Sequence, residues 1–324
     1  MARARAQLVD PQVTSYYHCM SRCVRRAFLC GNDRYSGRSF DHRKAWIAER
    51  MKELVEIFAI DVCAYGLMSN HFHLILRLVA PAAASWTDEE VITRYEKIFP
   101  KAVANGRLLP PSRWPSIVAI WRERLASLSW FMRALNESIA RRANREDNVT
   151  GRFWEGRFRS QALLDVGALL TCMTYVDLNP IRAGLADTLE DSDFTSIRER
   201  LLAAARPAGE TSAVCPEGLL PFFDQVQGGS GVEPLPATFA DYVEMVKWTA
   251  DAYRNRANVV PPPAVIERIG LDPTELVETM RSYPRRFFTM VGETHRIDLE
   301  AKRRGYRKRP GIGAAKRLYR ARAA

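Results

Sequence analysis

A short His-x-His pattern inside an aliphatic run constrains this chain most. Residues 67–76 carry His71 and His73 on either side of Phe72. On an extended strand successive side chains point to opposite faces, so the two imidazoles share one face and Phe72 and Leu74 share the other. Two neighbouring imidazoles on one sheet face are half of a divalent-metal site. The alternative is a strand in which one histidine is packed and the other is solvated.

The hydrophobic periodicity predicts an α+β fold, in which helices pack on a small, mostly antiparallel sheet. Strands are expected over residues 13–24, 60–67 and 71–79, with a tight turn at Ser69 and Asn70 between the last two. Helices are expected over residues 43–59, 116–144, 165–178, 239–254 and 273–281. The segment 81–115, which has prolines near both ends, is expected to be an insertion.

Composition divides the chain into a main domain and C-terminal additions. Residues 1–205 are expected to form the main domain, 206–236 a Gly- and Pro-rich linker, 237–300 a small helical extension and 301–324 a basic tail. Ten Lys and Arg follow Glu300 without any acidic residue, so most of the formal net charge of +11 belongs to the tail. Such an arm, with Tyr306 and Tyr319 interleaved, suits phosphate backbones and bases. Its alternative is a solubilising terminus.

Composition also excludes some classes of protein. Apolar residues make up 47% and charged residues 26% of the 324 residues, as in ordinary globular proteins. There is no apolar run of the roughly 18 residues that a membrane span needs, and residues 1–5 do not resemble a secretory signal. Six scattered cysteines without a Cys-x-x-Cys pair are expected to be reduced thiols. We therefore expect a cytoplasmic, nucleoid-associated protein without membrane contact. A phosphate-binding Gly-x-x-x-x-Gly-Lys-Ser/Thr motif is absent, so no nucleotide cofactor is expected.

A second polar pattern lies on the helix predicted over residues 165–178. Tyr175 and Asn179 are four residues apart, so they share a helix face. A tyrosine hydroxyl there could act as a nucleophile, and the amide oxygen of Asn179 could be a third metal ligand. Alternatively, Tyr175 is a core residue with a solvated hydroxyl, and Asn179 caps the helix before Pro180.

Four motifs in order resemble those of the single-tyrosine HUH transposases, and more closely those of the REP-associated tyrosine transposase branch. The resemblance covers roughly residues 13–200, and the chain departs from it at Ser69, where proline is common, and at Cys23, where glycine is common. The motifs are Tyr17-His18-Cys19-Met20-Ser21-Arg22, then Met68-Ser69-Asn70-His71-Phe72-His73, then residues 151–158 (GRFWEGRF), and Tyr175-x-x-x-Asn179-Pro180-x-Arg182-Ala183-Gly184.

The resemblance implies a ferredoxin- or RRM-like HUH endonuclease fold and a DNA-cleaving activity. Tyr175 would attack single-stranded or hairpin DNA, forming a 5′-phosphotyrosine link and a free 3′-hydroxyl that can later rejoin the strand. A tyrosine hydroxyl is a weak nucleophile at neutral pH, so it needs help. The resemblance implies a divalent ion, Mg²⁺ or Mn²⁺, held by His71, His73 and Asn179. Members of the family are monomers or homodimers, and both remain open for this chain.

Arginines beside aromatic residues suit DNA phosphates and unstacked bases. The alternative for these residues is a solvated helix face with a packed hydrophobic cluster. The expected DNA-binding residues are Arg141, Arg142, Arg145, Arg152, Trp154, Arg157 and Arg159, followed in the tail by Lys302, Arg303, Arg304, Arg307, Lys308 and Arg309.

Two other functions compete with a tyrosine transposase. One is a metal-dependent hydrolase that activates water at the histidine pair, although no third histidine or aspartate lies near His73 in the sequence. The other is a non-catalytic regulatory protein that binds repeat DNA. A hydrolase would not need Tyr175 and would leave no protein–DNA adduct, whereas a binding protein would cleave nothing.

Overall fold

The computed structural model describes residues 8–24, 30–32, 37–206, 215–226, 231–255 and 260–320, which form a mixed α+β fold. Within these residues, one five-stranded sheet has the order β2-β3-β1-β4-β5, antiparallel except between β4 and β5. The strands are β1 (Tyr16–Arg22), β2 (Ile60–Leu67), β3 (His71–Leu78), β4 (Arg159–Leu163) and β5 (Met290–Val291). The predicted strands 60–67 and 71–79 are confirmed, and β1 is shorter than the predicted 13–24.

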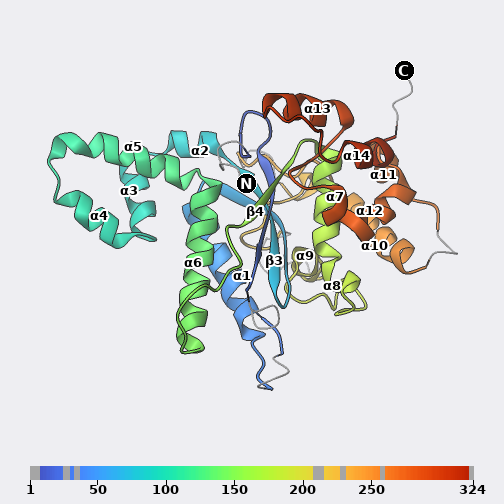
Figure 1. Ribbon diagram of the computed structural model, residues 1–324, viewed down its shortest axis with the longest axis horizontal. Helices are drawn as coiled ribbons and strands as arrows, with labels where there is room; N and C mark the ends of the chain where they lie inside the picture. The colour runs from blue at the N-terminus through green and yellow to red at the C-terminus, as the bar shows by residue number, and fades with distance from the viewer. Residues whose placement is uncertain are drawn as a thin grey trace.

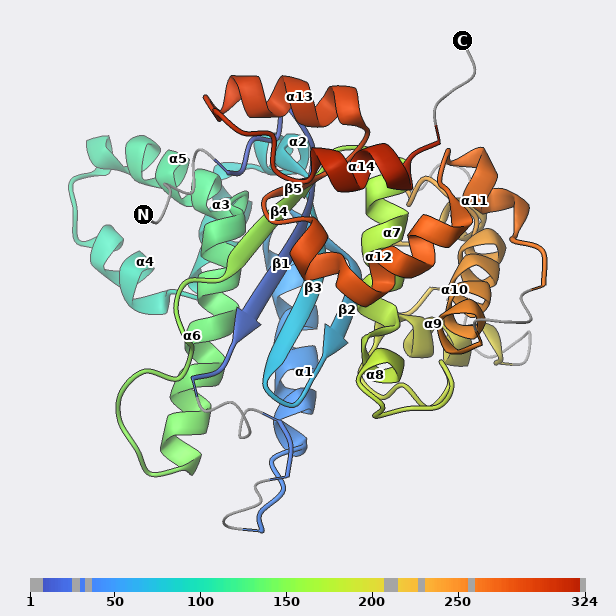
Figure 2. The same cartoon turned by 45° about the vertical axis from the view of Figure 1, so that its right-hand side comes forward.

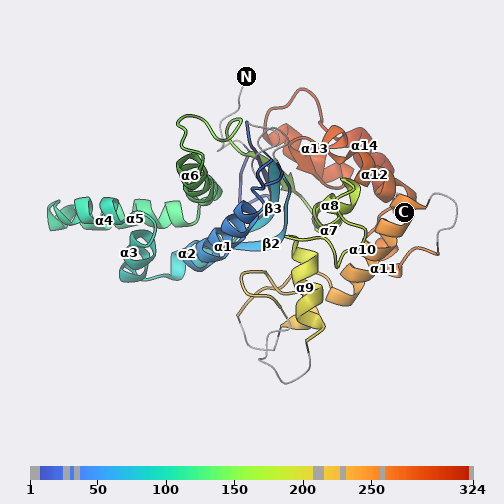
Figure 3. The ribbon, with the colours of Figure 1, turned by 90° about the horizontal axis from the view of Figure 1, so that it is seen from below.

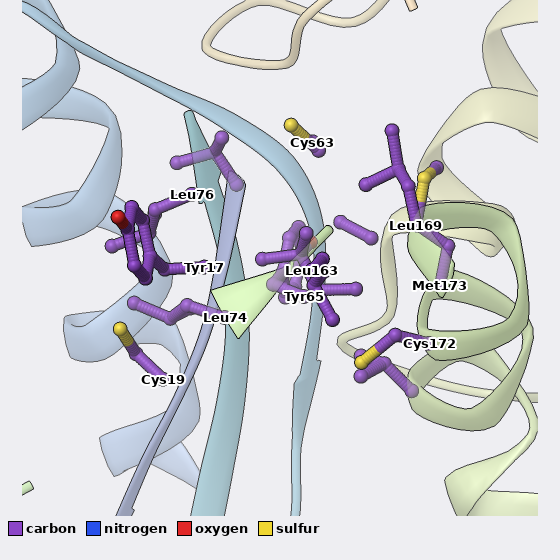
Figure 4. Close-up of a cluster of buried hydrophobic side chains, with 14 of the residues drawn as sticks. Tyr17, Cys19, Cys63, Tyr65, Leu74, Leu76, Leu163, Leu169, Cys172 and Met173 are labelled. Carbon is purple, nitrogen blue, oxygen red and sulfur yellow. The ribbon is translucent and has the colours of Figure 1, made fainter. Parts of the chain in front are cut away.

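The strand register places the polar motif residues on one face of the sheet. Residue 18 of β1 lies opposite Ile75 of β3 and Gln161 of β4, and Met20 lies opposite His73. Because side chains alternate, His18, His73 and Gln161 share a face. Figure 4 shows the apolar packing on both sides of the sheet, with Tyr17, Leu74 and Leu76 on one side and Leu169, Cys172 and Met173 on the other.

Helices cover the two faces unequally. Helices α1 (His42–Ile57) and α6 (Leu128–Glu146) pack together on one face, where the buried Arg43 of α1 pairs with Glu146. Helix α7 (Val166–Asp177) packs on the other face against β2, β3 and β4 (Figure 2). All of its residues except Val166 are buried, which explains its almost continuous apolar sequence.

The predicted insertion is helical. It comprises α2 (Ala80–Ser85), α3 (Asp88–Glu96), α4 (Pro100–Arg107) and a 3₁₀ turn (Pro111–Arg113), and with α5 (Trp114–Leu125) it projects to one side of the sheet (Figure 1). Tyr95 of α3 stacks on Trp121 of α5 with ring centroids 4.9 Å apart. The single helix predicted over 116–144 is therefore incorrect. It divides at Ala126–Ser127, because α5 packs on α3 whereas α6 packs on α1.

The C-terminal part packs on the sheet and on α7 instead of standing apart (Figure 3). Leu220, within the expected linker 206–236, donates its backbone N–H to Val62 of β2 at 2.8 Å, and Phe222 is fully buried. Residues 207–214 and 227–230 of that linker lie outside the described residues. The remaining elements are α8 (Asn179–Arg182), α9 (Ser196–Ala204), η3 (Phe223–Gln225), α10 (Phe239–Arg254), α11 (Ala264–Arg268), α12 (Pro273–Arg286), α13 (Thr294–Arg303) and α14 (Ile312–Leu318).

The first twenty residues of the expected basic tail are folded. The end of α13 and all of α14 belong to this segment, and Ala315 and Leu318 are fully buried. The hydroxyl of Tyr319 donates to Asp165, the N-cap of α7, at 2.7 Å. Residues 321–324, with Arg322, lie outside the described part of the chain. Among the helices that are described, none is both long enough and apolar enough to span a bilayer.

Candidate functional site

The two motif histidines and Tyr175 come together between β3 and α7. The ring centroids of His71 and His73 are 4.9 Å apart, and those of His73 and Tyr175 are 5.7 Å apart. Gly66 of β2 lies opposite His73 and makes this approach possible. A Cβ at that position would lie 2.9 Å from the backbone oxygen of Val176, which follows Tyr175. A larger residue would therefore push α7 away from the histidines.

Each histidine is held through its Nδ1 atom. His71 Nδ1 lies 2.6 Å from Oδ1 of Asn70, an acceptor, so His71 donates from Nδ1 and keeps a free lone pair on Nε2. His73 Nδ1 lies 2.8 Å from Nε2 of His18 on β1. Nε2 of His73 is buried and has no hydrogen-bond partner. Both imidazoles are therefore oriented with Nε2 as the atom left for a ligand.

The site keeps its histidines neutral. Burial, reinforced by the nearby positive charge of Arg22, lowers the pKa of His71 to about 4. Burial also lowers the pKa of His18 to about 4 and that of His73 well below its ordinary value. Neutral imidazoles are the form that binds metal ions, so these side chains need not lose a proton first.

Asn179 lies just beyond the end of α7. It begins α8, directly after Leu178, and is 7% exposed. Its Nδ2 is buried without a partner, and its Oδ1 accepts only a long bond of 3.4 Å from Nη1 of Arg182. The guanidinium of Arg182 lies 4.2 Å from the centre of the Tyr175 ring. Tyr175 therefore lies within the last turn of α7, whereas Asn179 lies just beyond that helix, at the start of α8.

These side chains fit a divalent ion. The unpartnered His73 Nε2, the free Nε2 of His71 and the weakly bonded Oδ1 of Asn179 are two nitrogen donors and one oxygen donor of the kinds that Mn²⁺ and Mg²⁺ accept. Across the described residues, this cluster included, no group of three or more His, Cys, Asp and Glu side chains is placed to hold a metal ion. A metal at this site therefore depends on the asparagine oxygen.

Tyr175 is covered by the C-terminal part of the chain. It is 4% exposed, and its ring stacks on that of Tyr283 with centroids 4.3 Å apart. Helix α12 is kinked at Ser282, next to Tyr283 and Pro284, as expected for proline inside a helix. Burial raises the pKa of the Tyr175 hydroxyl, and the charge of Arg182 opposes that rise. A cavity of about 80 Å³ lies beside Tyr175, His73 and Tyr283, well below the roughly 300 Å³ of a typical ligand pocket.

Three arginines line a second cavity, which adjoins the small cavity beside Tyr175. Arg22 of β1, Arg159 of β4 and Arg157, which precedes β4, line a hollow of about 190 Å³ together with Met20 and Glu155. All three arginines are exposed, and none has an ion pair within the described residues. Arg159 also lines the small cavity beside His73 and Tyr175, and Arg157 lines the adjacent hollow. Arg152 is exposed on the preceding loop.

The arginines of α6 lie on the other face of the sheet from Tyr175. Arg141, Arg142 and Arg145 line a groove of about 860 Å³ that α6 forms with α4. Arg141 pairs with Glu137, and the guanidinium of Arg142 lies 3.8 Å from the centre of the Trp46 ring. These arginines therefore form a basic surface of their own and do not join the histidine cluster.

Two sets of expected DNA-binding residues are placed differently from the prediction. Trp154 is 8% exposed, packs edge-on against Phe72 and donates Nε1–H to the backbone oxygen of Asn136 at 2.8 Å. It is therefore a core residue, because neither face of its ring is open to a base.

Four of the six basic residues expected in the tail are engaged in ion pairs. Arg303 pairs with Asp10 and the buried Glu300, Arg304 is itself 2% exposed and pairs with Glu300, and Lys302 and Arg309 pair with Asp298. Arg307 and Lys308 are exposed. The segment therefore offers fewer free charges than its sequence suggested.

The sequence reasoning missed four residues of the cluster. His18 and Arg182 are in the motifs but received no role, although strand alternation could have placed His18 on the histidine face. Gln161 and Tyr283 carried no signal. Gln161 lies on a strand that was not predicted, and Tyr283 is more than one hundred residues from Tyr175 in the chain.

Comparisons with known proteins give only a remote likeness. No protein-family model and no curated protein matches the sequence. One solved structure that matches is that of a REP-associated tyrosine transposase bound to a REP hairpin, with 11% identity and a TM-score of 0.39. The match covers 67% of this chain and 97% of that one. The function proposed below therefore rests on the geometry of the site.

Proposed function

We propose that this protein is a metal-dependent tyrosine transposase that nicks and rejoins single-stranded or hairpin DNA. The observation that carries the proposal is the convergence of Tyr175, near the end of α7, with His71 and His73 of β3, while Asn179 begins the helix that follows α7. The four come from segments about one hundred residues apart. A tyrosine hydroxyl beside two neutral imidazoles, each with Nε2 left for a ligand, suits phosphodiester cleavage through a covalent intermediate.

The strand order supports this assignment. The elements β1, α1, β2, β3, α6 and β4 follow the β-α-β-β-α-β order of ferredoxin-like folds, with β1 and β3 in the centre of the sheet. In that arrangement the two central strands carry His18 and His73, and α7 covers them after β4. We infer that this is the HUH-type fold that the motifs suggest.

The chemistry follows from the groups present. His71, His73 and Asn179 would hold Mg²⁺ or Mn²⁺, which when bound polarises the scissile phosphate and offsets its developing charge. The oxygen of Tyr175 attacks phosphorus, the bond to the 3′-oxygen breaks, the phenol proton passes to solvent and the departing 3′-oxygen takes up a proton. Arg182 lies against the Tyr175 ring and favours the phenolate. The reverse attack by a 3′-hydroxyl rejoins DNA, so no nucleotide cofactor is needed.

Two basic surfaces suit the DNA. Arg22, Arg157 and Arg159 lie next to the cluster and carry no competing ion pairs among the described residues, so they can hold phosphates close to Tyr175. The groove with Arg141, Arg142 and Arg145 lies behind the sheet and could hold a more distant duplex stem. Because Tyr283 and Phe287 cover the small cavity at Tyr175, DNA entry requires that α12 move.

The covering of Tyr175 favours a second candidate, a protein that binds repeat DNA without cleaving it. In that case the arginine surfaces would act alone, and the buried tyrosine would be a core residue. The experiment below separates the two candidates.

The test uses single-stranded hairpin oligonucleotides labelled near the 3′ end, with Mn²⁺ or Mg²⁺. We expect a labelled, slower-moving protein band on a denaturing gel. Tyr175→Phe should abolish that band, because only the nucleophilic oxygen is lost, while its DNA affinity stays within about twofold of wild type, roughly 0.4 kcal/mol. Tyr253→Phe serves as a matched control, since it removes a phenol oxygen on α10, outside the histidine cluster, and should retain the band. Binding without an adduct across a broad hairpin set would favour the non-catalytic protein.

A further inference from the structure

A chain of hydrogen bonds runs from the C-terminal part of the protein to the histidine cluster. The hydroxyl of Tyr283 on α12 lies 2.9 Å from Oε1 of Gln161 on β4. The same oxygen lies 3.2 Å from Nδ1 of His18, and Nε2 of His18 lies 2.8 Å from Nδ1 of His73. His18, Gln161 and Tyr283 are all buried. The chain ends at Nε2 of His73, which is buried without a partner.

The order of donors and acceptors decides what His73 can do. An amide oxygen only accepts, so a hydrogen on His18 Nδ1 must point to Gln161. A neutral imidazole has one N–H, which leaves His18 Nε2 as an acceptor. His73 must then donate from Nδ1, and its Nε2 carries a lone pair. If the amide of Gln161 were reversed, each step would reverse, and a hydrogen on His73 Nε2 would block a metal ion.

We propose that His18 and Gln161 are positioning residues that fix the tautomer of His73 and so make its Nε2 a metal ligand. This inference rests on the proposed function for the identity of the site. It assigns to His18 and Gln161 a role in metal binding that the proposed function does not give them. The tautomer of His71 is fixed in the same way by Asn70, its neighbour in the chain. The tautomer of His73 depends instead on residues from two other strands. Outer partners of this kind typically change metal affinity by about 10- to 100-fold.

The geometry explains why these roles fall to buried residues. The ring of His18 lies nearly parallel to that of His73, with centroids 5.0 Å apart, and is flanked by Tyr175 and Tyr283. With β1 between β3 and β4, the pairing of His18 opposite Gln161 is set by strand register. The tautomer of His73 therefore depends on partners that are themselves buried and held by the sheet.

The test reads the tautomer directly in the protein without DNA or metal. Nitrogen-15 NMR of the histidine side chains should show His73 with its hydrogen on Nδ1. Gln161→Leu should give a mixture of tautomers at His18 and His73 and raise the Kd for Mn²⁺, measured by calorimetry, about 10-fold or more. Gln161→Glu keeps an acceptor facing His18 and should restore the tautomer and most of the affinity. A merely structural role for Gln161 would alter thermal stability in both variants and leave the tautomer unchanged.

The outcomes separate this inference from the proposed function. A hydrogen on His73 Nε2 in the wild type, or an unchanged Mn²⁺ affinity in Gln161→Leu, would overturn the inference even if DNA is cleaved. A tautomer and affinity that respond as expected would uphold it even if no hairpin yields an adduct. If Gln161→Leu does not fold, the wild-type tautomer and the affinity of Gln161→Glu still decide the question.

Discussion

His73 shows how much one buried side chain depends on its surroundings. The same imidazole on a solvated strand would titrate near neutral pH and exchange tautomers freely. Here it lies between His71, His18 and Tyr175, and burial lowers its pKa well below the ordinary value. The result is an imidazole that stays neutral at physiological pH.

A pH dependence follows from His18. Its pKa is lowered to about 4 in the folded protein from an ordinary value of 6.5, so its contribution to stability is complete above 6.5 and is lost as the pH falls toward 4. The loss is at most about 1.4 kcal/mol per pH unit. We expect the stability gap between wild type and His18→Gln to narrow by about 1–2 kcal/mol from pH 7 to pH 5, measured by urea unfolding without metal.

The comparison of wild type with variant is needed because Asp177 acts in the opposite direction. Burial raises the pKa of its carboxyl to about 6, so its contribution is present at low pH and is lost as the pH rises through 6. Asp177 is present in both wild type and His18→Gln, so its contribution cancels in the difference between their free energies of unfolding. A gap that does not change with pH would contradict the neutral, buried state of His18.

Helix α7 places Tyr175, the proposed nucleophile, through its close approach to β2. That approach needs a glycine at position 66, because the backbone of Val176 lies against it. The N-terminus of α7 is held by Asp165, which accepts from Ala168 within the helix and from Tyr319 and Glu293 of the C-terminal part. Its C-terminal end is held by Asp177, which accepts from Ser196 and Tyr242. Both ends of the helix are therefore fixed by distant segments.

Gly66→Ala tests this packing. We expect it to lower the free energy of unfolding by about 1–3 kcal/mol, because the added methyl group collides with the backbone of α7. It should also reduce adduct formation, since Tyr175 moves away from His73. Gly313→Ala is a matched control: its added Cβ would meet open space within α14, and the change should be neutral or slightly stabilising. Unfolding in denaturant measures both, and equal stabilities for the two variants would refute the packing argument.

At the level of the whole chain, the C-terminal third completes the main domain. β5 extends the sheet beside β4, Tyr242 donates to Asp177, and Tyr283 stacks on Tyr175. Removal of residues after Glu300 would take away α14 and the hydroxyl of Tyr319, and with them part of the support of α7. Such a truncation would alter both the stability of the fold and the net charge, so a change in DNA affinity could not be assigned to the lost charges alone.

The DNA-binding role of this basic segment is better tested by two surface substitutions. Arg307 and Lys308 are exposed, so the double change Arg307→Ala and Lys308→Ala should leave the fold intact. If both contact phosphates, DNA affinity should fall and the slope of log K against log salt should become shallower by about 1.4. The measurement is Kd for a single-stranded hairpin across a salt series. An unchanged slope would exclude these two residues from phosphate contact.

Features that depend on short stretches of sequence could be predicted, whereas features that depend on distant contacts could not. Residues 60–67 and 71–79 were predicted almost to the residue, because strand alternation and the turn are short-range properties. The same alternation put His71 and His73 on one face, whereas the helix that carries Tyr175 ends before Asn179, which begins the next helix. The break between α5 and α6 could not be predicted, since both halves are apolar at helical spacing and only their different partners separate them.

Local pattern thus established a histidine pair, a tyrosine–asparagine pair and an α+β architecture. Folding joined the two pairs, buried Trp154, folded the basic segment onto Glu300 and Asp298, and brought Gln161 and Tyr283 to His18. These are contacts between residues far apart in the chain. Their energies depend on packing and on exclusion of water, which no short stretch of sequence encodes.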